Sequence, residues 1–125
     1  MIVRNIKDVP AMAYGTGARK RIMIGPEEGA PTFVMRVFDV PPGGASNDHS
    51  HDFEHEVLIL QGEATCKGDG PDQHVSEGAA YFIPANERHQ IVNTGKGNLR
   101  FVCLVPLRGE DSVGSACFVD PAARK

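Results

Sequence analysis

Short apolar runs alternate with polar turns along most of the 125 residues. The runs are rich in β-branched and aromatic residues, and glycine, proline, asparagine or aspartate bounds each of them. No helical period stands out, and the near-regular spacing of the runs predicts an all-β sandwich or barrel. We expect six short strands, at residues 19–24, 32–40, 56–61, 79–84, 89–93 and 99–105.

The 14 glycines and nine prolines are scattered along the whole length rather than gathered in a linker, as in a domain with many tight turns. Asp69, Gly70 and Pro71 predict a hairpin loop. Residues 11–18 fit either irregular chain or a strand borrowed by a partner subunit, and residues 116–119 fit an edge strand. We expect one domain over residues 1–125, divided as follows: an N-terminal strand segment 1–29, a barrel core over about 30–107 and a C-terminal tail 108–125.

Length and charge narrow the class of protein. A chain of this size buries enough surface to fold around one core without a disulfide or metal staple. The formal net charge is −3, and we interpret the basic run Arg19-Lys20-Arg21 as a solvated strand end rather than a nucleic-acid-binding stripe. No stretch approaches the ~18 apolar residues of a membrane span. We therefore expect a cytoplasmic protein that binds neither nucleic acid nor membranes.

The three cysteines, Cys66, Cys103 and Cys117, show no CxxC spacing. An odd number without that spacing predicts neither a disulfide framework nor a zinc ribbon. Reduced thiols in a cytoplasm are the simplest interpretation.

Three of the five histidines lie in the segment HSHDFEH, residues 49–55. A helix would bring His51 and His55 together, but His49 lies two residues from His51, and prolines and glycines precede the segment. On a strand the three side chains share a face. Four residues of straight strand span about 13 Å, however, too far for two ligands that each sit about 2 Å from one metal ion. If all three bind one ion, the chain must bend between Asp52 and Glu54.

A lone histidine is usually satisfied by ordinary hydrogen bonds, whereas a cluster favours a metal site. A fourth candidate, His89, follows a strand and a turn.

The segments that carry these four histidines, within residues 43–93, resemble the two signature segments of the cupin superfamily. The first signature is a glycine, five residues, His-x-His, three or four residues, a glutamate, six residues and a glycine; the second is a glycine, five residues, Pro-x-Gly, two residues, a histidine, three residues and an asparagine. The matching positions are Gly43, His49, His51, His55 and Gly62, then Gly78, Pro84, His89 and Asn93.

Two positions depart from the signatures. Asn86 replaces the glycine after Pro84, a mild change because asparagine tolerates a left-handed backbone. His55 stands where the glutamate is usual. The neighbouring Glu54 and Glu56 do not restore the carboxylate, because strand parity turns both away from the histidine face.

With four histidines, residues 18–108 resemble the small single-domain bacterial cupins whose manganese ion is held by four imidazoles. This resemblance implies a double-stranded β-helix, or jelly-roll barrel, and a homodimer. It also implies one divalent metal ion, with Mn as the first expectation. Imidazole ligands suit Fe, Ni, Zn or Cu as well, but tetrahedral Zn would be saturated by four of them. The implied ligands are His49, His51, His55 and His89.

Four neutral ligands leave the ion its full charge, so it acts as a strong Lewis acid and favours an anion at its remaining positions. No catalytic residue is assigned, but Arg36, Phe101 and Cys103 are candidate pocket residues. Arg36 could point inward to an anionic group or, as we slightly favour, outward into water. Cys103 could face the metal, although a small core residue is the commoner case. We expect His74 to be exposed and a pocket wall of Phe38, Phe53, Ile59, Ile91 and Phe101.

Three functions fit these features. The first is a metal-dependent oxidoreductase, of the dioxygenase or oxidase type, acting on a small organic molecule that is largely apolar or carries a carboxylate. The second is a non-catalytic module that binds or senses a small ligand. The third is a metal-assisted isomerase or lyase. The fold alone does not separate them, because one fold hosts many functions.

Overall fold

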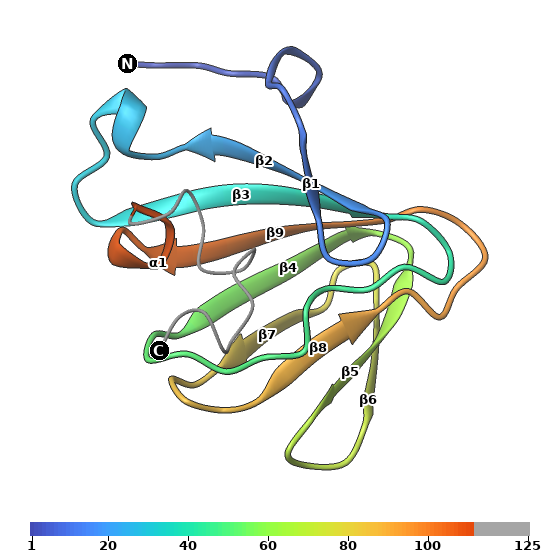
Figure 1. Cartoon of the computed structure of the whole chain (residues 1–125). Coiled ribbons are helices and arrows are strands. Elements are labelled where there is room, and N and C mark those ends of the chain that lie inside the picture. The colour runs from blue at the N-terminus through green and yellow to red at the C-terminus, as the bar shows by residue number, and fades with distance from the viewer. Residues whose placement is uncertain (112–125) are drawn as a thin grey trace.

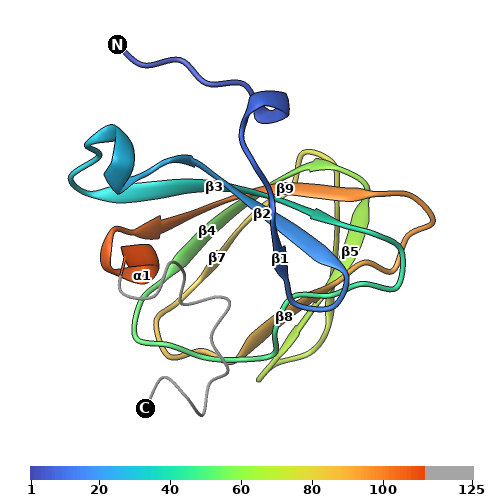
Figure 2. The same cartoon turned by 45° about the horizontal axis from the view of Figure 1, so that its top comes forward.

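The computed structural model describes residues 1–111, whose strands form two antiparallel sheets that face each other (Figure 1). The larger sheet has the order β1-β2-β3-β9-β4-β7, and the smaller has the order β6-β5-β8. Together they enclose the interior of a flattened barrel, seen from a second direction in Figure 2. The all-β jelly-roll barrel expected from the sequence is confirmed. The strands are β1 (Met12–Tyr14), β2 (Ala18–Ile24), β3 (Phe33–Val40), β4 (His55–Gln61), β5 (Glu63–Gly68), β6 (Gln73–Ser76), β7 (Ala80–Ile83), β8 (His89–Val92) and β9 (Leu99–Pro106).

All six strands expected from the apolar runs are present, as β2, β3, β4, β7, β8 and β9. The strands β5 (EATCKG) and β6 (QHVS) were not among the six, because they contain few apolar residues. β1 pairs with β2 of the same chain, so residues 12–14 form an edge strand of the chain's own larger sheet. The expected hairpin loop joins β5 to β6. The edge strand expected at residues 116–119 lies outside the described residues, as does Cys117.

Three short helical segments complete the described part of the chain: η1 (Ile6–Asp8), η2 (Pro26–Glu28) and α1 (Arg108–Asp111). α1 follows β9 directly and lies beside the end of the larger sheet (Figure 1). Within residues 1–111, no helix is long and apolar enough to cross a bilayer.

The core lies between the two sheets, where alternate residues of each strand point inward. Phe38 of β3 and Phe101 of β9 are cross-strand partners, and their rings stack with centroids 4.9 Å apart. The same parity turns Arg36 and Cys103 inward, because this cross-strand pair lies two positions along from Phe38 and Phe101. The inward face is thus apolar toward both ends of β3 and β9 and polar near the middle of these strands.

The outer side of the larger sheet is covered only in part. Val9, in the N-terminal segment, packs with Met23 and Val37 into a small second core. Further along the sheet, apolar side chains of β3, β4 and β7 remain open to solvent, with exposed fractions of 38% for Met35, 43% for Leu58 and 59% for Phe82. These three residues, with Val102 and Leu104 of β9, line one shallow surface, which we call the outer patch.

The basic run at the start of β2 is not a solvated strand end. Arg19 is exposed and Arg21 pairs with Asp39, but Lys20 is completely buried. Strand parity turns Lys20 into the barrel, where its Nζ lies 2.8 Å from a carboxylate oxygen of Glu110 in α1. The burial is tolerated because the carboxylate supplies the opposite charge.

Candidate metal centre

Backbone hydrogen bonds hold together the two segments that carry the histidines. The His49 N–H donates to the carbonyl of His89 at 3.1 Å, and the His89 N–H donates to the carbonyl of His49 at 2.9 Å. Nearby, the Ser46 N–H donates to the carbonyl of Ile91, and the Ile91 N–H donates to the Ser46 hydroxyl, both at 2.9 Å. Residues that lie 40 positions apart in the sequence are therefore direct neighbours at the site.

The bend expected between Asp52 and Glu54 is present, and β4 begins immediately after it at His55. The bend is fixed from α1, where the Arg108 guanidinium donates to the side chain and carbonyl of Asp52 at 2.9 and 2.8 Å. Phe53 is buried and stacks on the ring of His51, with centroids 3.9 Å apart. Both flanking glutamates, Glu54 and Glu56, are exposed as expected.

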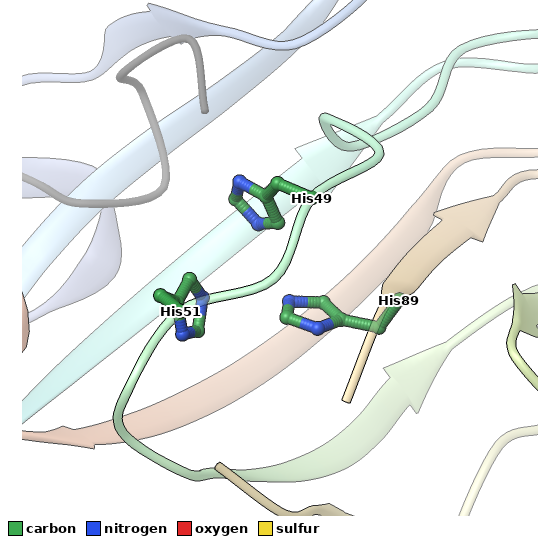
Figure 3. Close-up of side chains that lie close together, drawn as sticks. All are labelled: His49, His51 and His89. Atoms are coloured by element: carbon green, nitrogen blue, oxygen red, sulfur yellow. The ribbon is translucent and has the colours of Figure 1, made fainter. Parts of the chain in front are cut away.

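The bend and the paired segments bring all four histidines together. The rings of His49, His51 and His89 point toward a common space (Figure 3), and the nitrogens they offer lie within 4.8 Å of one another, close enough for one metal ion. His55 joins them from β4, with its Nε2 2.8 Å from Nε2 of His51 and its ring centroid 4.9 Å from that of His89. Two imidazole nitrogens at 2.8 Å either share a proton or face a common ion.

The second nitrogen of each ring shows whether this donor set fits a metal. Nδ1 of His51 lies 3.1 Å from the carbonyl oxygen of Phe53, and Nδ1 of His89 lies 2.9 Å from that of Glu87. A carbonyl only accepts, so each Nδ1 carries the hydrogen and each Nε2 presents a lone pair. This is the arrangement in which ligating histidines are usually held. The buried Nδ1 of His49 has no hydrogen-bond partner within residues 1–111.

The surroundings of His55 differ from those of the other three histidines. Its Nδ1 lies 3.0 Å from Sγ of Cys103 and 3.4 Å from Nη2 of Arg36. Arg36 is completely buried and also donates to Cys103 and to Glu110. The outward orientation that we slightly favoured for Arg36 is therefore wrong: strand parity turns it inward, and Glu110 compensates its charge. Cys103 is buried in the core and is also next to the site.

A cavity of about 150 Å³ opens beside the histidines, and His49, His55 and His89 contribute to its lining. Its wall includes Phe38, Ile91 and Phe101, as expected, and Arg36 and Cys103. Phe53 and Ile59 are not part of the wall. The ring of Phe53 stacks on His51 instead, and Ile59 belongs to the apolar core.

Two further cavity residues, Tyr81 and Cys66, carry no signal in the sequence. Burial raises the pKa of the Tyr81 phenol well above 10, and it also raises the pKa of the Cys66 thiol, with which Tyr81 shares a hydrogen bond. Both groups therefore stay protonated at neutral pH and can donate hydrogen bonds. His74 lies on β6 away from the other histidines and is exposed, as expected, beside Glu63.

At the mouth of the cavity, an ion pair joins the two histidine segments through the residues next to His49 and His89. Arg88 donates to the two oxygens of Asp48 at 2.8 and 2.6 Å. The hydrogen bond lowers the pKa of Asp48 and raises that of Arg88. We expect this pair to keep the segments in register.

Residues 36–105 match the protein family described as Cupin domain. The chain belongs to the cupin family. The signature positions other than histidine shape the backbone of this cupin: Gly62 has a φ of +87°, and a Cβ there would lie 2.5 Å from the carbonyl oxygen of Asn98. Asn86 adopts the left-handed φ of +71° in place of the usual glycine. Asn93 is buried and donates to the carbonyls of Val40 and Gly97.

Among curated relatives, this cupin is similar to the oxalate-binding protein of Thermotoga maritima, with 35% identity over 69 residues, 54% of this chain and 57% of the relative. It is also 26% identical to auxin-binding protein T92 of Nicotiana tabacum over 110 residues. That alignment covers 76% of this chain and 57% of the relative. The chain thus spans little more than half the length of both relatives. The solved structure of the polyketide cyclase RemF from Streptomyces resistomycificus superposes with a TM-score of 0.78 at 31% identity, covering 86% of this chain and 80% of that chain.

Proposed function

We propose that this cupin is a metal-dependent oxidoreductase of the dioxygenase or oxidase type that acts on a small organic molecule. The observation that carries the proposal is the convergence of four imidazoles next to a cavity. His49, His51, His55 and His89 would be the ligands of one divalent ion. We expect Mn first and Fe second, because four protein ligands would saturate tetrahedral Zn and leave no position for a substrate.

The bound ion would supply Lewis acidity and redox chemistry, and four neutral ligands would leave its charge undiminished. The chain's own residues restrict what can approach. The cavity of about 150 Å³ admits only a small molecule or part of a larger one, and the stacked rings of Phe38 and Phe101 form an apolar wall that excludes water.

The buried charges favour a substrate with a negative group. In the part of the chain that the structure describes, the fully buried charged side chains besides the histidines are Lys20, Arg36 and Glu110, two cations against one carboxylate. Arg36 lines the cavity itself. A guanidinium in the cavity wall and a divalent ion beside it would both attract an anionic group, so we propose a carboxylate-bearing substrate.

The test begins with untagged protein, its metal content by elemental analysis and EPR, and its oxygen consumption with a panel of small carboxylates. We expect a redox-active metal near one equivalent and oxygen uptake with at least one carboxylate. His89→Ala should lose both, whereas His74→Ala, which removes an exposed histidine of β6, should lose neither. Full occupancy by Zn with no oxygen uptake would rule out the oxidoreductase.

A second candidate function is the binding of a small ligand without catalysis. The relatives named as oxalate-binding and auxin-binding proteins favour it. Calorimetric titration of the metal-loaded protein with oxalate and with an auxin separates the two candidates. Tight binding of either compound, without its consumption over hours, would favour the binding module.

We also propose that the protein is a homodimer in which the outer patch is buried. Contiguous exposed apolar surface on a protein commonly marks a contact site. Leu58 and Phe82 are exposed to 43% and 59%, and the apolar residues of β3, β9, β4 and β7 adjoin them across the sheet.

A further inference from the structure

A chain of buried polar contacts leads from β2 and α1 to His55, the histidine that stands where a glutamate is usual. Nζ of Lys20 lies 2.8 Å from one carboxylate oxygen of Glu110, and the other oxygen lies 3.3 Å from Nη1 of Arg36. Nη2 of Arg36 donates to Sγ of Cys103 at 2.9 Å, and that sulfur lies 3.0 Å from Nδ1 of His55. All five residues are at most 3% exposed.

The position of the hydrogen on the His55 ring determines whether Cys103 accepts or donates a hydrogen bond there. If Nε2 of His55 binds a metal ion, the hydrogen of the neutral ring must sit on Nδ1. Among the described residues, Arg36 and Cys103 contact Nδ1; Arg36 can only donate, whereas the sulfur of Cys103 can accept. The sulfur therefore takes the place that backbone carbonyls take beside His51 and His89.

The hydrogen bond between His51 and His55 requires the opposite arrangement when no ion separates them. Nδ1 of His51 carries a hydrogen for the Phe53 carbonyl, so Nε2 of His51 accepts and Nε2 of His55 donates across the 2.8 Å gap. Nδ1 of His55 then presents a lone pair, to which the Cys103 thiol can donate. A group beside Nδ1 that both donates and accepts, as a thiol does, serves both states.

We propose that Cys103 is the positioning residue for His55, and that Arg36, oriented by Glu110 and Lys20, holds the sulfur of Cys103 in place. This inference rests on the proposed metal site and adds to it a set of residues that hold one of the ligands in place. The Nδ1 contacts of His51 and His89 are made by backbone carbonyls, whereas the Nδ1 contact of His55 is made by side chains. Substitution can therefore remove it without moving the ligand-bearing segments.

The test compares Cys103→Val with Cys103→Ser in the full chain. Valine fills nearly the same volume without a hydrogen-bonding group, whereas serine keeps a group that donates and accepts. We expect Cys103→Val to bind Mn²⁺ about 10 to 100-fold more weakly than wild type, the usual effect of losing an outer hydrogen-bond partner of a metal ligand. Cys103→Ser should stay close to wild type. Free Mn²⁺ is measured by EPR, and the visible spectrum of the Co²⁺ form reports the arrangement of the ligands.

Stability of the metal-free protein in urea separates positioning from packing. A residue with only a packing role would lower the stability of the metal-free fold and leave the Mn²⁺ affinity and the Co²⁺ spectrum unchanged. If Cys103→Val has the Mn²⁺ affinity and the Co²⁺ spectrum of wild type, the proposed role of Cys103 is wrong, whereas the proposed metal site still stands. A wild-type protein that binds neither ion would overturn both proposals.

Arg36→Met provides an independent variant, informative even if Cys103→Val does not fold. It leaves Lys20 paired with Glu110, so the remaining buried charges balance. We expect weaker Mn²⁺ binding than in wild type, by a smaller factor than in Cys103→Val, because the sulfur remains but is no longer held. The control is Val34→Ala, an inward residue on the same strand that should lower stability only. Unchanged Mn²⁺ affinity in Arg36→Met would contradict the role of Arg36.

Discussion

The two faces of β3, β9 and β4 are built from alternate residues of the same strands, yet they differ in character. The inward face carries Arg36, Cys103 and His55, which are 0%, 3% and 3% exposed. The outward face carries the apolar Met35 and Leu58, which are 38% and 43% exposed. A sheet with one face on a core usually places apolar residues inside and polar residues outside.

The residues that depart from this usual pattern are the ones that we assign to the proposed site and to the proposed contact surface. A buried polar group must be compensated by a partner, so a group of them indicates a site rather than a stability device. An exposed apolar group indicates a contact surface when it adjoins others. Neighbouring residues of these strands therefore belong in turn to the proposed metal site and to the proposed contact surface.

The largest effect should come from shortening an apolar residue on the inward face. Ile59→Ala should lower the free energy of unfolding by about 2 to 5 kcal/mol, because Ile59 is 1% exposed and its loss leaves a cavity. Leu60→Ala, the next residue on the outward face, should cost less than about 1 kcal/mol. Urea unfolding measures both. Equal losses would show that the two faces are not energetically distinct.

The next prediction concerns the chemistry of the inward face. His55→Ala should lower the affinity for Mn²⁺ by at least about 100-fold, more than the loss of an outer partner would, because it removes a proposed ligand. The metal-free fold should remain. Glu56→Ala, one position along the chain and exposed, should bind Mn²⁺ like wild type. Unchanged metal content in His55→Ala would contradict the four-ligand proposal.

On the outward face, Leu58→Lys should weaken the proposed dimer. A lysine in an apolar interface must be desolvated without a partner, so we expect the dissociation constant of the dimer to rise at least about tenfold. Sedimentation velocity over a range of concentrations measures the change. Lys67→Ala, on β5 outside the outer patch, serves as the control. A wild type that is monomeric at high concentration would refute the dimer.

The smallest effect concerns Asp39, on the polar part of the outward face of β3. Burial raises its pKa, but hydrogen bonds from Arg100 and Asn98 and the charges of Arg100 and Arg21 outweigh that effect, so the pKa lies below its ordinary value of 3.8. A lowered pKa in the folded state stabilises the fold above the unfolded pKa, and this contribution is lost as the pH falls through the folded pKa.

Asp39→Asn should therefore be less stable than wild type at pH 7, and the difference should shrink once the pH falls below about 4. Urea unfolding at several pH values tests this. Asp72→Asn, which breaks the exposed pair with Lys67, should change stability little at any pH. A difference for Asp39→Asn that is constant down to the lowest pH would mean that its ion pairs do not stabilise the fold.

The features predictable from the sequence were those with a local pattern. Apolar runs gave six strands, and the spacing of the histidines indicated the bend at Asp52. The burial of Lys20 and Arg36 was not foreseen, because their partner Glu110 lies 90 and 74 positions away. A charge is interpreted as exposed unless its partner is known. The parity of Arg36 with Val34, Phe38 and Val40 was the available signal, but charge was given more weight.

The position of β9 bears on how the chain acquires its fold during synthesis. β9, at Leu99–Pro106, is the last strand of the described residues, yet it lies between β3 and β4 in the middle of the larger sheet. Until residue 106 has left the ribosome, β3 and β4 have no common neighbour, and each presents an open edge that invites pairing with another chain. We therefore expect nascent chains stalled before β9 to depend on chaperones more than chains that include it.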